Sequence, residues 1–121
     1  MAITLTTPDC GPGSFDGFIV NGVSADASGC EELKAAPAAG SSILVSHLTI
    51  NNGGNALSHT IGAGETGSAV TAALIGAVAM AANTSLQLDF YPPMRLPAAT
   101  SLVIDSSGAG AVCVVVQGRV E

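Results

Sequence analysis

The segment AVCVVVQGRV, residues 111–120, carries the clearest strand pattern in the chain. Alternate positions of a β-strand face opposite sides of its sheet. One side of this segment holds four valines, Val112, Val114, Val116 and Val120. The other side begins with Cys113 and Val115, so the first half of the segment is apolar on both sides. Such a strand is central in its sheet, or is covered by a second sheet or another subunit.

Similar patterns recur toward the N-terminus, separated by turns rich in Gly, Asn and Ser. They predict strands at residues 15–20, 43–52, 56–64, 85–90 and 101–105. In the segment 30–42 a strand and a single helical turn both fit. The sequence NNGGN at 51–55 predicts a hairpin, across which His47 and His59 would face each other.

The alanine-rich stretch 69–82 is ambiguous, because Val70, Leu74 and Val78 fall at helical spacing while the neighbouring segments favour a strand. We expect a strand there. Short strands about ten residues apart predict an all-β fold, an antiparallel β-sandwich or jelly-roll-like single domain. We assign residues 29–121 to this domain and residues 1–28 to an N-terminal arm or edge segment.

The segment YPPMRLP at 91–97 contains Pro92, Pro93 and Pro97, and each proline fixes φ and removes an amide donor. We expect a stiff loop between two strands that presents Arg95, flanked by Met94 and Leu96, as an interface anchor. In the alternative interpretation, Met94 and Leu96 close the end of the sandwich and Arg95 lies in water. Tyr91, the single tyrosine, caps the core or fills a subunit contact.

The composition favours protein partners. Charged residues make up 10% of the 121 residues, against about 25% in typical domains. We interpret this deficit as a surface that meets other protein chains; the alternative is an ordinary Ala- and Gly-rich β domain. The net charge is −6, and the fixed positive charges are Lys34, Arg95 and Arg119. This balance argues against nucleic acid and against anionic membranes as partners.

Three other features of the sequence indicate the cellular compartment in which the chain folds. The uncharged stretch 66–88 is too rich in Ala and Gly, and its fully apolar part too short, for a membrane span. The N-terminus has neither the basic nor the apolar region of a signal peptide, which predicts folding in the cytoplasm. Cys10, Cys30 and Cys113 leave one thiol unpaired in any intramolecular scheme. Pairing of Cys10 with Cys30 stays open, and reduced thiols are the default.

Residues that carry chemistry form no recognisable constellation. We find no metal-ligand spacing, no nucleophile motif and no phosphate-binding loop, and we expect no enzyme activity, metal or cofactor. A shared zinc site at His47 and His59 would need a third ligand. Asp89 and Asp105 could form the carboxylate pair of a glycosidase, but solvent-facing strand ends are the interpretation we prefer.

Three segments, 29–54, 59–90 and 96–120, together resemble small structural proteins of tailed bacteriophages and prophages. They read GCEELKAAPAAGSSILVSHLTINNGG, HTIGAGETGSAVTAALIGAVAMAANTSLQLDF and LPAATSLVIDSSGAGAVCVVVQGRV. The resemblance implies a β-sandwich virion protein, a trimeric head-decoration (cement) protein on the capsid surface. Its partners would be the major capsid protein and further copies of itself. It transfers no catalytic or ligand residues.

From the residues themselves we expect a set of interface candidates: Phe15, Phe18, Tyr91, Met94, Arg95, Leu96, Cys113 and Val115. The alternative function is a phage tail or fibre module with a host-binding or structural role.

Overall fold

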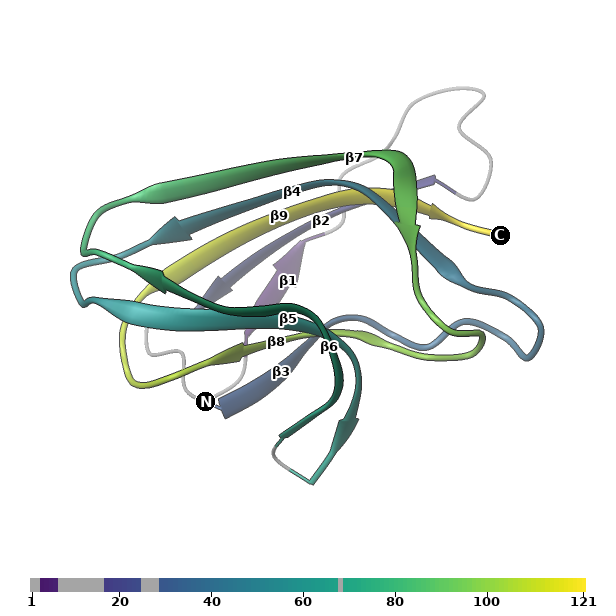
Figure 1. Cartoon of the computed structure of the whole chain (residues 1–121), viewed down its shortest axis with the longest axis horizontal. Helices are drawn as coiled ribbons and strands as arrows, with labels where there is room; N and C mark the ends of the chain where they lie inside the picture. Colours follow the sequence, from purple (N-terminus) through teal and green to yellow (C-terminus); the bar gives the residue numbers. More distant parts are fainter. Residues whose placement is uncertain (1–2, 7–16, 25–28, 68) are drawn as a thin grey trace.

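The computed structural model describes residues 3–6, 17–24, 29–67 and 69–121, and every regular element in them is a β-strand (Figure 1). The strands form two antiparallel sheets. The five-stranded sheet has the order β1 (Thr4–Thr6), β2 (Gly17–Ser24), β9 (Val112–Val120), β4 (Ile43–Asn52) and β7 (Ser85–Arg95). The four-stranded sheet has the order β3 (Gly29–Lys34), β8 (Leu102–Ser106), β5 (Leu57–Thr66) and β6 (Ala69–Met80). The predicted all-β class is confirmed, and the two sheets are compatible with a β-sandwich.

Strand β9 lies in the middle of the five-stranded sheet, between β2 and β4. Val112, Val114 and Val116 are buried against the other sheet, which agrees with the valine pattern. The alanine-rich stretch is strand β6, paired with β5. Strands β1 and β2 come from the segment that we expected to be an arm or edge segment. β1 is the edge of the five-stranded sheet, whereas β2 pairs with β9 along its full length.

The expected hairpin at residues 51–55 is wrong. Strand β4 pairs with β7 and β9, and β5 lies in the other sheet, so this turn crosses from one sheet to the other. Turn residues reverse the chain in either case, and the sequence pattern does not say which sheet receives the next strand. His47 and His59 consequently lie in different sheets and do not face each other.

Two strands run past their expected ends. β2 continues through Gly22 to Ser24, where we expected a break. A Cβ at Gly22 would lie within 3.3 Å of Ile3, Leu5 and Leu33, so the glycine allows close packing rather than a turn. β7 continues through the prolines to Arg95. The expected loop therefore begins only at Leu96, and the strand that follows it, β8, lies in the other sheet.

Prolines fit in β7 because it is an edge strand whose outer backbone groups need no partner. Its pairing with β4 is interrupted: His47 lies opposite Asp89, and Val45 lies opposite Met94. The additional residues of β7, Phe90 to Pro93, form a bulge that contains a cis peptide bond between Tyr91 and Pro92. The bulge re-aims the side chains at this edge.

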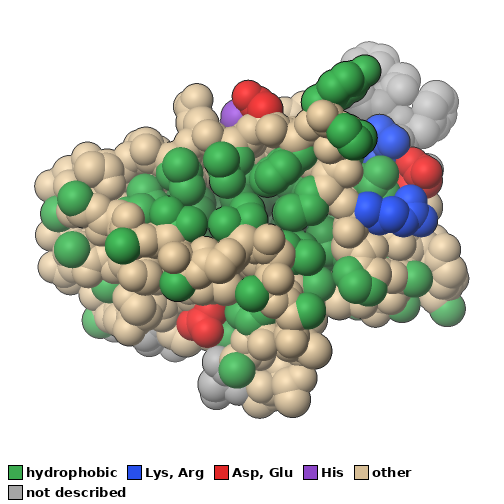
Figure 2. Space-filling model, in the orientation of Figure 1, with side chains coloured by type: hydrophobic (Ala, Val, Ile, Leu, Met, Phe, Trp, Pro, Cys, Tyr) green, Lys and Arg blue, Asp and Glu red, His purple; other side chains and the backbone are tan. Residues whose placement is uncertain are grey.

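The core is closed on one side of the sandwich and open on the other. On the closed side, Leu33 of β3 is fully buried beside Gly22 of β2. On the opposite side, β6 and β7 are the edges of their sheets. Figure 2 shows a band of hydrophobic side chains across the visible face between these strands. We call this region the open side; its partly buried side chains are Leu74, Ile75 and Val78 of β6 and Leu86, Leu88, Phe90 and Met94 of β7.

Candidate interaction surfaces

The two arginines lie at one end of the five-stranded sheet, around the C-terminal residue. Arg95 of β7 and Arg119 of β9 are both opposite Leu44 of the intervening strand β4. Arg119 Nε and Nη2 each lie 3.0 Å from Glu121 Oε2. Arg95 Nη1 lies 3.7 Å from the other carboxylate oxygen, Oε1. All three side chains are about half exposed, so this ion pair network adds little to stability and remains accessible to a partner.

The third basic residue, Lys34, lies toward the same end. Its ammonium group is 4.9 Å from the ring centre of Phe18, a cation–π contact. Phe18 is buried and lies opposite Gly118, the neighbour of Arg119. We call Lys34, Arg95 and Arg119 the basic end. Because these are all the Lys and Arg residues of the chain, its fixed positive charge is concentrated there.

The proline-rich segment has one prominent side chain. Tyr91 is 100% exposed at the bulge of β7, so it neither caps the core nor packs within this copy of the chain. Leu96 is 1% exposed and lies in the core, as in the alternative interpretation of this segment. Met94 is partly buried against the core. A partner at this edge would therefore meet the exposed Tyr91 and the half-exposed Arg95.

A hollow of about 130 Å³ lies beside this segment. It is lined by residues of β4, β7 and β9: Leu44, Ser46, Pro93, Gln117, Gly118 and Arg119. Gly118 is required for this geometry, because a Cβ there would overlap the carbonyl oxygen of Leu44. The hollow suits one small side chain of a partner, held next to the Arg119 guanidinium.

Cys113 and Val115 lie on the outer face of the five-stranded sheet, both half-buried. Cys113 Sγ donates a hydrogen bond to Asn21 Oδ1 of the neighbouring strand, at 3.2 Å. Farther across this face, His47 Nδ1 pairs with Asp89 and His47 Nε2 lies 2.9 Å from Thr49 Oγ1. Asp89 is thus in the middle of β7, not at a strand end as we expected.

A buried polar cluster joins the two sheets around His59, which is fully buried. His59 Nε2 lies 3.1 Å from Asn52 Oδ1, and Nδ1 lies 2.9 Å from Ser106 Oγ. Because Oδ1 can only accept, the imidazole carries its proton on Nε2 and accepts at Nδ1 from the serine hydroxyl. Burial lowers the pKa of His59 from its ordinary value of 6.5, which keeps the ring neutral.

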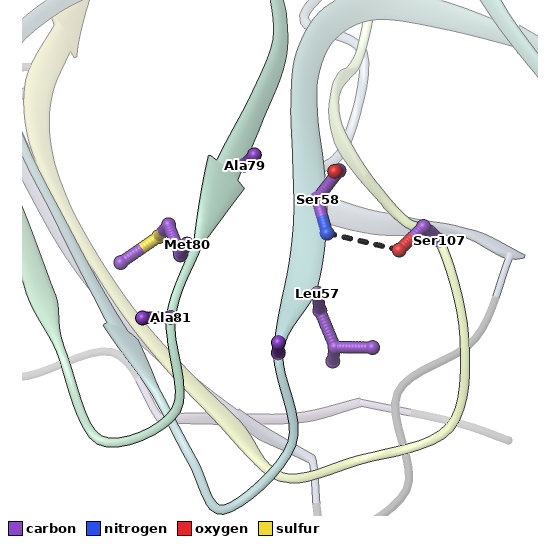
Figure 3. A pocket seen from close by; sticks show the side chains of 7 residues that line it. Leu57, Ser58, Ala79, Met80, Ala81 and Ser107 are labelled. Carbon is purple, nitrogen blue, oxygen red and sulfur yellow. Dashed lines mark hydrogen bonds between the residues drawn. The ribbon is translucent and has the colours of Figure 1, made fainter.

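The side-chain nitrogen of Asn52, Nδ2, donates hydrogen bonds to backbone carbonyl oxygens of two chain segments. It lies 2.9 Å from the oxygen of Asn55, between β4 and β5, and 3.3 Å and 3.0 Å from those of Met80 and Ala81, at the end of β6. Outside these contacts is a hollow of about 330 Å³ between the ends of β5, β6 and β8 (Figure 3). The backbone nitrogen of Ser58 donates to Ser107 Oγ, at 2.9 Å, at its rim. None of the described residues that line the hollow is charged.

Cys30 lies on β3 opposite Asp105 of β8. Burial, together with the charges of Glu65, Asp105 and Glu31, raises the pKa of its thiol to about 11. Burial also raises the pKa of Glu31. In the described residues Cys30 and Cys113 are not bonded to each other. Cys10 lies outside the described residues, and so does the interface candidate Phe15.

Asp89 and Asp105 lie in different sheets. Among the residues that the structure describes, no three His, Cys, Asp or Glu side chains gather closely enough to hold a metal ion. The same part of the chain contains no helix long and apolar enough to cross a membrane.

Sequence reasoning missed two surfaces. The open side depends on which strands become sheet edges, although the charge-free run 66–88 was a usable signal for it. The pairing of Glu121 with both arginines depends on β7 and β9 flanking β4. No family model, curated protein or solved structure matches this chain.

Proposed function

We propose that this chain is a decoration protein of a tailed-phage head, which binds the assembled major capsid protein and stabilises the shell. The observation that carries the proposal is Tyr91, a fully exposed aromatic residue in the same edge strand, β7, as the half-exposed Arg95. Tyr and Arg, together with Trp, are the residues enriched among those that dominate binding energy at protein interfaces. In this chain, with 3% aromatic residues, an unburied Tyr is best explained by a partner.

The local backbone supports such a contact. Pro92 and Pro93 restrict the bulge that carries Tyr91, so little conformational entropy is lost when a partner docks. The hollow beside Arg119 lies next to Pro93 and offers room for one side chain of the capsid protein. A protein that binds only the assembled shell shifts the assembly equilibrium toward the shell by mass action. Decoration would place the chain on the capsid surface of the virion.

The proposal is tested by co-sedimentation with empty shells assembled from the major capsid protein of the same genome. We expect Tyr91→Ala and Arg95→Glu each to weaken binding at least about tenfold, because each removes an anchor group worth more than 1 kcal/mol. Glu32→Gln, an exposed change in β3 of the other sheet, is the control and should bind normally. Wild-type protein that fails to sediment with shells would overturn the proposal, and binding to purified tails instead would favour the tail module.

A further inference from the structure

We propose that the open side is the surface through which copies of this chain associate, with β7 of one copy packed against β6 of the next. This inference is independent of capsid binding, because it concerns the free protein. It rests on the incomplete burial of the core, the distribution of charge and the sizes of the side chains on the two edge strands.

The core is incomplete on this side. Leu74, Ile75 and Val78 of β6, with Leu86, Leu88 and Phe90 of β7, pack against core residues but remain partly exposed. Each belongs to the edge strand of its sheet, so no further strand within the described residues covers them. On the other side of the sandwich the equivalent position is filled by Leu33, which is fully buried. The hydrophobic band in Figure 2 is therefore core surface that a single copy leaves in water.

Charge favours a second copy as the occupant. The chain has a net charge of −6, so two copies repel each other over most approaches. Residues 66–88, which include all of β6 and the first part of β7, have no charged side chain. Edge strands of monomeric proteins are usually protected by charged residues. β6 and residues 85–88 of β7 lack this protection. Two acidic chains therefore repel each other least when they approach through these segments.

The two edges also complement each other in size. The exposed residues of β6 are all small: Ala69, Thr71, Ala72, Ala73, Gly76, Ala77 and Ala79. Before the bulge, the partly buried side chains of β7 are large: Leu86, Leu88 and Phe90. The small residues of β6 leave room for the large side chains of β7 from another copy, and each copy carries both strands. Two copies therefore provide the matching partners without a third component.

Side-chain packing explains this contact better than an added hydrogen-bonded strand. The pairing of β6 with β5 shifts register twice, between His59 and Ile61 and between Ile61 and Gly62. Such bulges twist an edge strand and disfavour continuous pairing with a new strand. The β7-to-β6 contact forms twice in a two-fold dimer and three times in a three-fold ring. The measured mass decides between these closed forms.

The test compares two glycine-to-lysine variants by light scattering over a dilution series. Gly76 lies in β6, and Gly54 lies in the turn between β4 and β5. Both are exposed, and an ideal Cβ at either position has no atom within 4 Å. Each variant therefore adds the same charge without a clash inside one copy. We expect the wild type and Gly54→Lys to be oligomers of equal mass, and Gly76→Lys to dissociate at concentrations at least tenfold higher.

Amide hydrogen exchange of the wild type gives a second readout that needs no variant. Amides of β6 and β7 should exchange more slowly at high than at low protein concentration, while those of the outer edge strand β1 should not change. A wild type that is monomeric throughout the series would overturn the inference. Equal stability of the oligomers formed by the two variants would also overturn it. If the wild type is a monomer and Gly76→Lys impairs its binding to capsid shells, the open side is instead assigned to the capsid protein.

Discussion

The imidazole of His59 and the side-chain amide of Asn52 form a hydrogen bond of 3.1 Å between the two sheets of the sandwich. Ser106 binds the other ring nitrogen, and Asn52 in turn binds backbone carbonyls of the turn after β6. The cluster is fully inside the fold, where a satisfied polar network fixes one arrangement of the sheets. It specifies how β4 crosses over to β5.

Acid should destabilise the protein through His59. Burial lowers the pKa of this ring, so below about pH 6.5 the unfolded chain binds a proton that the folded chain does not. Stability therefore falls as the pH decreases from 6.5 toward the lower folded value. Urea unfolding at pH 7.5 and pH 5.5 should show the stability advantage of wild type over His59→Gln shrinking by about 1 kcal/mol. An advantage that is equal at both pH values would contradict this prediction.

Removal of the Asn52 side chain should cost much more than removal of its neighbour. Asn52→Ala leaves the buried Nε2–H of His59 without an acceptor and removes a donor to the carbonyls of Met80 and Ala81, and we expect a loss of about 2–4 kcal/mol. Asn51→Ala is the control. Asn51 lies on the outer face and accepts one hydrogen bond, from Ser85, so its loss should cost less than about 1 kcal/mol. Equal unfolding midpoints in denaturant for the two variants would refute a structural role for the cluster.

Gly118 should tolerate no side chain. A Cβ at this position overlaps the carbonyl oxygen of Leu44 on the adjacent strand, and backbone cannot move aside as a side chain can. We expect Gly118→Ala to destabilise the fold by about 3 kcal/mol or more. Gly54→Ala, in the turn between β4 and β5, where a Cβ meets nothing within 4 Å, should be neutral or slightly stabilising. Denaturant unfolding of both variants measures the difference, and a stable Gly118→Ala would show that β4 and β9 can separate.

The Cys30 thiol should react slowly. With a pKa of about 11, caused first by burial and then by Glu65, Asp105 and Glu31, its thiolate fraction at pH 8 is small. We expect alkylation by iodoacetamide to be at least about tenfold slower than that of a model thiol. Asp105→Asn should accelerate the reaction, because it removes one of the charges that oppose the thiolate. Peptide mass spectrometry measures the rate at Cys30 alone; reaction at the model rate would contradict the prediction.

Much of the local structure follows from the sequence. The valines of residues 112–116 predicted a strand with a buried face, and the alternation at residues 85–90 predicted a half-buried one. Both patterns come from side-chain hydrophobicity at a period of two, which is a local property. The same property led to the all-β class. In the alanine-rich stretch the spacing of Val70, Leu74 and Val78 suited a helix, and only the neighbouring segments favoured the strand that the structure has there, β6.

The sequence did not determine which strands become neighbours. Asn and Gly at residues 51–55 allow the chain to reverse, but the reversal joins two sheets instead of two paired strands. For the same reason, the prolines at 92 and 93 predicted a loop, whereas an edge strand accommodates them because one side of its backbone needs no hydrogen bonds. Strand pairing depends on contacts between residues far apart in the chain, which no local pattern encodes.

The candidate surfaces divide in the same way. From the sequence alone came the scarcity of charge, the three cations and the exposed role expected of Arg95. Only the tertiary structure placed Glu121 between two arginines, buried Leu96, exposed Tyr91 completely and left the β6–β7 side of the core open. Hydrophobicity and charge are properties of each residue, and the sequence states them directly. Exposure and proximity are set by the order of strands in the two sheets, which is decided only when the whole chain packs.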